Sequence, residues 1–187
     1  MFAAVPLPDD VVADLEEFLE PRRESAPFRW TRPETWHVTL AFMAAVPDRS
    51  VDDLVERLTR AARRRARVVL RIEGGGAFPN PGRAKVLYAA VAGEAEALEE
   101  LRRLSVGARA AAGKAGAPAD GGPFRAHVTL ARINKPVEAT RWVRVLGTYR
   151  SRDFELAEMV LVESHLGQGP GGRPRYDVVH RCPVGAG

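Results

Sequence analysis

The sequence feature that most constrains the fold is a repeated tetrapeptide. His-Val-Thr-Leu occupies positions 37–40 and again 127–130, and an alanine follows each copy. Side chains alternate between the two faces of a β-strand, so each copy would present its histidine and threonine on one face and its valine and leucine on the other. The apolar pair can anchor the strand to a core while the polar pair faces a shared surface. Two copies predict a duplicated fold of two lobes, related by a pseudo-twofold axis, with one cleft between them.

Hydrophobic patterns around each copy predict a similar succession of strands and helices. Short apolar or β-branched runs predict strands over residues 2–7, 36–43, 68–72, 85–91, 126–133, 154–156, 159–162 and 176–179. Helical periodicity predicts helices after Asp9-Asp10, after Ser50, over 94–112 and over 137–146. The glycine-rich segments 74–82 and 113–122 are expected to be connections, the second a flexible loop near the cleft.

Length and composition predict a single globular domain. The chain has 187 residues, of which 45% are hydrophobic and 28% charged, so residues 1–187 can bury one sizeable core. No apolar stretch approaches the roughly 20 residues that cross a bilayer, and the N-terminus lacks the pattern of a secretory signal. We therefore expect a cytoplasmic protein with no membrane partner, and a monomer by default. The single cysteine, Cys182, excludes an internal disulfide.

The charge balance argues against a protein that coats nucleic acid. There are 28 Lys and Arg residues against 24 Asp and Glu, a net charge of only +4. The run Arg63-Arg64-Arg65, with Arg60 and Arg67, lies at the end of a helical pattern, where cations suit the helix dipole. We expect this run to be a solvated helix face.

The repeated motif also fits the chemistry of phosphodiester cleavage. Of His37 and His127, one as neutral imidazole can deprotonate the attacking water and the other as imidazolium can protonate the departing oxygen. The hydroxyls of Thr39 and Thr129 can hold the non-bridging oxygens. This scheme demands neither a metal nor a cofactor. Either motif alone is a weak signal, but the pair is a strong one.

These residues resemble the two-histidine (2H) phosphoesterase superfamily, whose signature is a pair of His-x-Thr/Ser-x motifs in a duplicated α+β fold. Within it, the chain is similar nearly end to end to the bacterial and archaeal RNA 2′,3′-cyclic phosphodiesterases, first named 2′-5′ RNA ligases. The similar segments are 2–8, 36–42, Phe78-Pro79, 124–132 and 163–176. The resemblance implies two pseudo-symmetric lobes with antiparallel sheets, helices outside and a central cleft.

The resemblance also implies an activity and roles for individual residues. The activity would be hydrolysis of an RNA terminal 2′,3′-cyclic phosphate to a 2′-phosphate, with reversible 2′-5′ ligation detectable in vitro. His37 would be the acid and His127 the base, although the residues alone leave these roles open. Arg132 would contact the phosphate, and Phe42 would stack on the terminal base. Equally, Arg132 could be a surface arginine and Phe42 a core residue.

Other functions keep the same residues. The substrate could be a small cyclic nucleotide, such as ADP-ribose cyclic phosphate, instead of RNA. The cleft could bind nucleotide or RNA without turnover, or His37 and His127 could be ligands of a metallohydrolase, although no carboxylate stands at ligand spacing near either motif. Ala126 and Tyr88 replace a proline and a tryptophan of the familiar pattern, which leaves the preferred substrate length open.

Overall fold

The computed structural model describes residues 1–26 and 28–185, which form an α+β fold. The strands are β1 (Phe2–Pro6), β2 (Arg29–Trp30), β3 (His37–Phe42), β4 (Val69–Phe78), β5 (Ala84–Ala92), β6 (His127–Val137), β7 (Phe154–Glu155), β8 (Glu158–Gly169) and β9 (Arg173–Pro183). The α-helices are α1 (Asp9–Arg23), α2 (Val51–Arg63), α3 (Ala95–Lys114) and α4 (Thr140–Leu146). Short 3-10 turns lie between several of them.

The strands form one antiparallel sheet in the order β7-β4-β5-β6-β3-β1-β8-β9, and β2 pairs with the free side of β6. Its two halves meet where β3 pairs with β6 through Val38 and Val128. The order is symmetrical about this point, because β1 lies between β3 and β8 as β5 lies between β6 and β4. This arrangement confirms the duplicated two-lobe fold with antiparallel strands.

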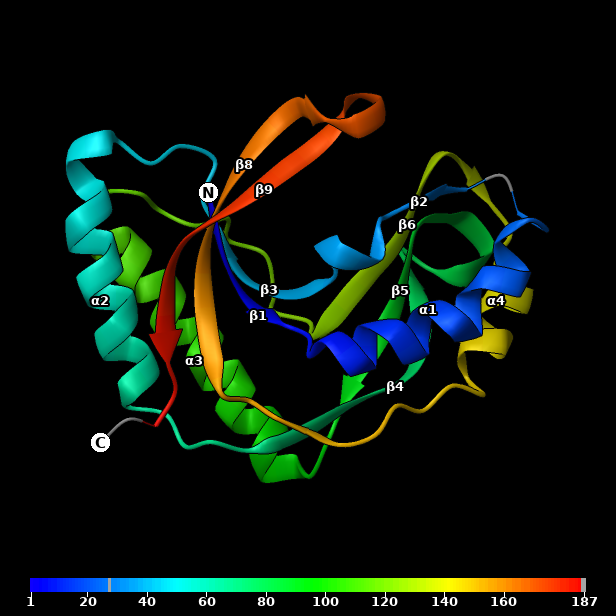
Figure 1. The fold of residues 1–187 in the computed structure, drawn as a ribbon, viewed down its shortest axis with the longest axis horizontal. Helices are drawn as coiled ribbons and strands as arrows, with labels where there is room; N and C mark the ends of the chain where they lie inside the picture. Colours follow the sequence, from blue (N-terminus) through cyan, green and yellow to red (C-terminus); the bar gives the residue numbers. More distant parts are fainter. Residues whose placement is uncertain (27, 186–187) are drawn as a thin grey trace.

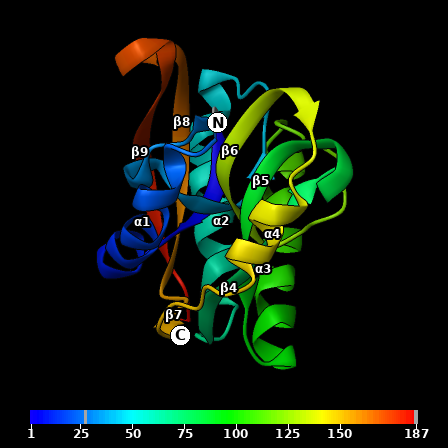
Figure 2. The same cartoon turned by 90° about the vertical axis from the view of Figure 1, so that its right-hand side faces the viewer.

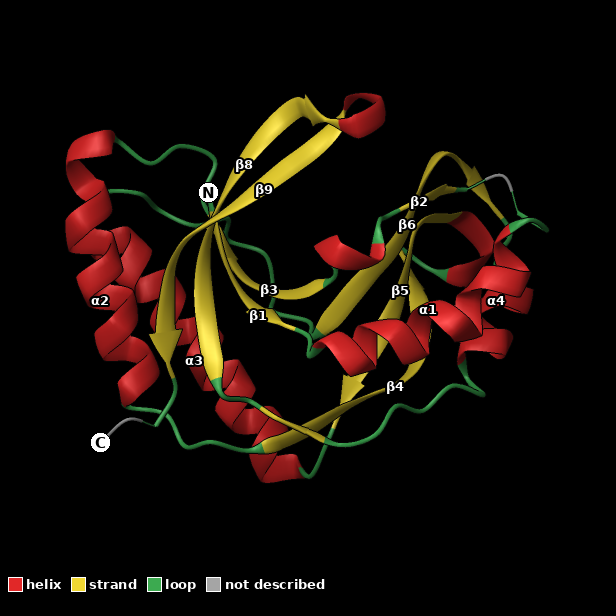
Figure 3. Ribbon diagram, in the orientation of Figure 1, coloured by secondary structure: helices red, strands yellow, loops and turns green. Residues whose placement is uncertain are grey.

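The helices cross between the two lobes. Helix α1 follows β1, yet it packs near α4, where Asp14 accepts a hydrogen bond of 2.6 Å from the hydroxyl of Tyr149. Helix α3 follows β5, yet Ser105 in α3 donates a 2.7 Å hydrogen bond to the carbonyl of Leu40 in β3. Figure 1 shows the result, with α2 and α3 at one end of the molecule and α1 and α4 at the other, and Figure 2 looks onto the end that carries α1 and α4. Figure 3 shows the strands between these two helix pairs, so each lobe is completed by a helix from the other half of the chain.

The repeated tetrapeptides contribute to the core as their alternation predicts. Val38 and Leu40 are 1% exposed, and Val128 and Leu130 are completely buried. The histidines and threonines between them are half-buried on the opposite face of the sheet. The sheet therefore has a packed face under the helices and an open face that carries the polar residues of both motifs.

Several predicted boundaries were wrong. The segment 74–82 is not all connection, because β4 continues to Phe78, with Gly74 at φ 71° and a register shift between Ile72 and Gly75. Such an irregularity lets a strand bend without ending. The helix predicted over 137–146 begins only at Thr140, because β6 extends through Val137. Strands β8 and β9 are longer than predicted, and the two-residue strand β2 was not predicted.

Among the described residues, no helix has the length and apolar character needed to cross a membrane.

Candidate active site

His37 and His127 begin β3 and β6, the two strands at the centre of the sheet. Val38 and Val128 are opposite one another in this antiparallel pair. Residues directly opposite in a sheet point to the same face, and their neighbours point to the other face. The two histidines and the two threonines of the motifs therefore share the open face of the sheet.

Each histidine ring is held by the same hydrogen bond. Nδ1 of His37 donates to the carbonyl of Thr35, and Nδ1 of His127 donates to the carbonyl of Arg125, both at 2.7 Å. A carbonyl can only accept, so the proton of a neutral ring lies on Nδ1 and the lone pair on Nε2. In both rings Nε2 is thus the atom that can take up or release a proton.

The surroundings disfavour the charged form of both histidines. The pKa of His37 is lowered from 6.5 to about 4, mainly by burial and also by the nearby charges of His127 and Arg132, while the hydrogen bond to Thr35 acts in the opposite direction. Burial and the charge of Arg132 also lower the pKa of His127, against the hydrogen bond to Arg125. Val38 pairs with Val128 across β3 and β6, so each histidine lies one residue from this pairing point. Without a bound anion, the neutral form of His37 is strongly favoured.

Aromatic rings support both histidines, but from different strands. The His37 ring stacks on Phe2 at 4.6 Å between centroids and meets the edge of Tyr176 at 5.7 Å. His127 meets Phe78 at 5.0 Å and Tyr88 at 5.4 Å, in edge-to-face arrangements. These contacts fix the plane of each imidazole ring, as an acid or a base requires.

Gly76 makes room for the aromatic support of His127. It lies opposite Tyr88 across β4 and β5. A Cβ at residue 76 would stand 2.4 Å from the hydroxyl oxygen of Tyr88, closer than any real contact. Only glycine lets the Tyr88 ring lie over β4 in this position.

A cavity of about 340 Å³ opens on this face of the sheet. It is lined by five predicted site residues, namely His37, Thr39, Phe42, Thr129 and Arg132. Its remaining lining comes from Phe2, Thr31, Thr35, Ser164, Leu166, Pro174 and Tyr176. His127 is not part of the lining and adjoins the cavity from β6. The structure thus gathers five of the six predicted site residues at one cavity, which joins residues of both lobes.

Phe42 and Arg132, for which the sequence left two interpretations open, both lie at the cavity. Phe42 is 45% exposed at the cavity wall, so it is not a core residue. The loop that follows α3 meets this strand end, where the amide of Asp120 donates to the carbonyl of Phe42 at 2.9 Å. Arg132 is exposed on β6 and lines the same cavity as His37, and its charge lowers the pKa of both histidines.

Sequence reasoning gave no role to several residues of this site. Tyr176 lies in a segment similar to the 2H phosphoesterases, but nothing in the sequence pairs it with His37. Thr31 accepts a 2.9 Å hydrogen bond from the indole of Trp36 and donates to the carbonyl of Thr129 at 2.8 Å. It therefore braces the second motif from the end of β2. No local pattern signals such a contact.

No cluster of three or more His, Cys, Asp or Glu side chains arranged to hold a metal is found in residues 1–26 and 28–185.

Comparison with known proteins identifies the family. The model of the LigT-like phosphoesterases matches residues 5–88 and 92–171. The RNA 2′,3′-cyclic phosphodiesterase of Geobacillus stearothermophilus is 30% identical over 98% of this chain, which spans only 56% of that protein's length. The enzyme of the same name from Thermus thermophilus is 31% identical over 95% of this chain and 99% of its own length.

A solved structure shares the fold over its whole length. The crystal structure of a Thermus thermophilus protein superposes with a TM-score of 0.78 at 28% identity, covering 98% of this chain and 97% of that one. Together with the match to the family model over both halves, this confirms the resemblance carried by the repeated motif. The chain belongs to the LigT-like phosphoesterases, a family of two-histidine phosphoesterases.

Proposed function

We propose that this protein hydrolyses the terminal 2′,3′-cyclic phosphate of RNA to a 2′-phosphate, with His37 and His127 as the catalytic pair. The observation that carries the proposal is the matched anchoring of the two rings, each with Nδ1 bound to a carbonyl and Nε2 left for proton transfer. The names of the relatives from Geobacillus and Thermus support the substrate class.

The reaction needs one proton acceptor and one proton donor on opposite sides of the phosphorus. A water oxygen attacks phosphorus and gives its proton to Nε2 of the neutral histidine. The bond from phosphorus to the 3′-oxygen breaks, and the other histidine, as imidazolium, protonates that oxygen. The product carries a 2′-phosphate and a 3′-hydroxyl, and exchange with solvent restores both rings. A 5′-hydroxyl of another RNA end that attacks in place of water would form a 2′-5′ phosphodiester and release the same 3′-hydroxyl, which is the ligation expected in vitro.

The remaining site residues bind the substrate in this proposal. The hydroxyls of Thr39 and Thr129 hold the non-bridging phosphate oxygens, supported by their place in the cavity wall. Arg132 offsets the charge that grows on the phosphate in the transition state. Phe42 stacks on the terminal base, for which its exposed ring at the cavity rim is suited.

The acid and base roles depend on the bound phosphate. By the resemblance, His37 is the acid, yet burial lowers its pKa to about 4 in the free protein. An anion beside the ring favours the imidazolium and raises this pKa. We propose that the bound substrate phosphate raises the pKa of His37, so that His37 is protonated in the complex. His127 stays neutral and acts as the base.

The proposal also includes the domain organisation, the oligomeric state and the cellular location of the protein. Residues 1–187 act as one domain of two intertwined lobes, supported by the helices that cross between the halves. In this proposal the protein acts as a monomer. An RNA substrate fits action in the cytoplasm.

The test is hydrolysis of a short RNA that ends in a 2′,3′-cyclic phosphate, with and without EDTA. We expect turnover that EDTA does not reduce and that falls sharply in His37→Ala and in His127→Ala. A reaction abolished by EDTA and restored by a divalent metal would instead assign the histidines as metal ligands. Binding without turnover by the wild-type protein would make the cleft a binding module.

A further inference from the structure

A second, smaller pocket of about 130 Å³ adjoins the active-site cavity. The two share a wall made of Thr31, Thr35, Arg132, Pro174 and Tyr176. The smaller pocket is completed by Arg29, Trp30, Arg32 and Arg173. A ligand in the cavity can therefore extend into it without leaving the protein surface.

The smaller pocket concentrates positive charge that the protein does not neutralise. Its lining holds four arginines, Arg29, Arg32, Arg132 and Arg173, and no carboxylate. Arg32 pairs with Glu34, whereas the other three have no ion pair within the described part of the chain. We call this group of four the arginine pocket.

The strand register makes this concentration of charge costly. Arg29 on β2 lies directly opposite Arg132 on β6. Like charges opposite one another across two strands destabilise a sheet. Arg173 lines the same pocket from β9, whose hairpin with β8 projects beyond the rest of the sheet with its tip on the side of β2 and β6 (Figure 1). An anion between these three strands would offset the repulsion.

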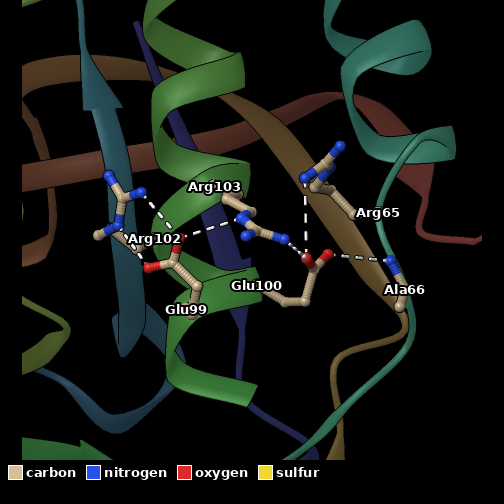
Figure 4. Close-up of polar contacts among 6 residues, drawn as sticks. All are labelled: Arg65, Ala66, Glu99, Glu100, Arg102 and Arg103. Atoms are coloured by element: carbon tan, nitrogen blue, oxygen red, sulfur yellow. Dashed lines mark hydrogen bonds and ion pairs between the residues drawn. The ribbon is translucent and has the colours of Figure 1, made fainter. Parts of the chain in front are cut away.

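Another basic region of the molecule shows the contrast. A groove of about 540 Å³ between α2 and α3 is lined by more arginines than the arginine pocket. There, however, most of the arginines are paired with carboxylates, and Figure 4 shows three of them, Arg65, Arg102 and Arg103. Glu99 accepts hydrogen bonds from Arg102 at 2.6 Å and Arg103 at 3.0 Å, and Glu100 pairs with Arg103 at 3.0 Å and Arg65 at 3.8 Å. This network fits the solvated helix face expected from the sequence, so the number of arginines does not by itself indicate an anion site.

We propose that the arginine pocket binds a phosphate on the 5′-oxygen of the same nucleoside whose 2′,3′-cyclic phosphate lies between His37 and His127. This inference rests on the proposed function and specifies its substrate. Guanidinium groups bind phosphate oxygens through paired, charge-assisted hydrogen bonds. The four arginines of the pocket favour an anion over an uncharged base, and Arg132 in the shared wall links the two phosphates of one nucleotide.

Two kinds of substrate carry such a phosphate. In RNA it is the phosphodiester that joins the terminal nucleotide to the rest of the chain. In a small nucleotide it is a terminal 5′-phosphate or diphosphate. The chemistry of recognition is the same, and the two sources differ in whether more chain must pass beyond the pocket.

Ligand binding tests the inference without requiring turnover. Calorimetry would compare adenosine 2′,5′-bisphosphate with adenosine 2′-monophosphate. We expect the bisphosphate to bind at least about 10-fold more tightly, as one or two charge-assisted hydrogen bonds imply. This ratio should approach one in Arg29→Gln and in Arg173→Gln.

A matched control lies on the same strand as Arg173. Arg175 pairs with Asp177 at 2.9 Å and does not line the pocket, so Arg175→Gln should keep the wild-type ratio. Equal affinities for the two ligands in the wild-type protein would overturn the inference, as would a ratio that survives both pocket substitutions. Because these ligands resemble the product, a failure of hydrolysis in the RNA assay would be a separate result.

Kinetics then identify the source of the phosphate. The substrates are adenosine 2′,3′-cyclic phosphate, its 5′-phosphorylated form, and a dinucleotide that ends in a 2′,3′-cyclic phosphate. If kcat/KM is higher for both phosphate-bearing substrates than for adenosine 2′,3′-cyclic phosphate, the phosphate belongs to an RNA chain. If it is higher for the 5′-phosphorylated mononucleotide alone, the substrate is a small nucleotide. The same kcat/KM for all three would contradict a 5′-phosphate subsite.

Discussion

The two lobes share the same strand arrangement but differ in the residues that surround their histidines. His37 and His127 have the same strand position, the same Nδ1 hydrogen bond and two aromatic neighbours each. However, burial lowers the pKa of His37 to about 4, and the fifth residue after it is the apolar Phe42. The fifth residue after His127 is the cationic Arg132.

This difference shows how a duplicated fold can support an asymmetric reaction. The repeated motif supplies two equivalent imidazoles, which alone could exchange roles. The surroundings then separate them, as they do for paired acids and bases in other enzymes. In the proposed mechanism, Arg132 contacts the phosphate from one lobe, and Phe42 offers a surface for a base from the other. The asymmetry lies in the residues around the motifs.

The largest expected effect is the loss of either histidine. His37→Ala and His127→Ala should each lower kcat by roughly 10² to 10⁴, because each removes a general acid or base. The double variant should lower kcat by far less than the product of the two single effects, since the two histidines act as a unit. Steady-state kinetics on a cyclic-phosphate RNA measure this.

His180 provides the control for these variants. It lies on β9 beside Thr59 of α2, with 3.4 Å between its Nε2 and the threonine oxygen, and it lines neither pocket of the site. His180→Ala should retain wild-type kinetics. If His37→Ala or His127→Ala kept the wild-type rate, only one lobe would be catalytic, and the proposed pairing of the two lobes would be wrong.

Substitution of the fifth residue after each histidine should change a different kinetic constant in each lobe. Arg132→Gln should lower kcat/KM by about 10² to 10³, mostly through kcat, because it removes charge stabilisation of the transition state. Phe42→Ala should raise KM by about 10-fold and leave kcat near the wild-type value, since stacking on a base contributes about 1–3 kcal/mol to binding. Similar effects on kcat in both variants would contradict the proposed division of roles.

The pH profile should report the burial of both histidines. Catalysis needs one ring protonated and one neutral, and both pKa values lie below 6.5 in the free protein. As pH rises above them the imidazolium is lost, so kcat/KM should peak below pH 6.5 and fall towards about pH 8. Bound phosphate favours the imidazolium, so the kcat profile should lie at higher pH. A maximum of kcat/KM above about pH 7 would contradict the account.

The smallest effect expected is at Gly76, which serves only the His127 lobe. Gly76→Ala places a methyl group 2.4 Å from the Tyr88 hydroxyl, so the ring must move and the protein should lose about 1–3 kcal/mol of stability. Gly113→Ala is the matched control, because nothing lies within 4 Å of its added methyl group and it sits in α3, where alanine is favoured over glycine. Thermal denaturation compares the two. Equal melting temperatures would mean that Tyr88 adapts without cost.

The sequence predicts those site residues whose positions depend only on the alternation of side chains along a strand. A repeated His-x-Thr-x in two strands defines the polar face of each, so His37, Thr39, His127 and Thr129 follow from the pattern alone. The duplication predicts that both faces meet. The error at β4 arose because three consecutive glycines suggest a connection, whereas here they allow a bulge and room for Tyr88.

The rest depends on contacts between segments far apart in the chain. Arg29 lies in a strand of two residues that has no periodicity, and its position opposite Arg132 follows only from the register of β2 on β6. Tyr176 reaches His37 through the long β8–β9 hairpin. The exchange of α1 and α3 between lobes is likewise a property of the tertiary packing. No single-sequence pattern carries this information.

The most direct test of the central claim follows the bond that breaks. A single-turnover reaction of a cyclic-phosphate RNA in ¹⁸O-labelled water, with EDTA present, would be analysed by mass spectrometry and by separation of the 2′- and 3′-phosphate products. Attack by water between two histidines predicts one ¹⁸O atom in the phosphate and the 2′-phosphate as the product. A 3′-phosphate product, an unlabelled phosphate or no reaction in EDTA would contradict the account.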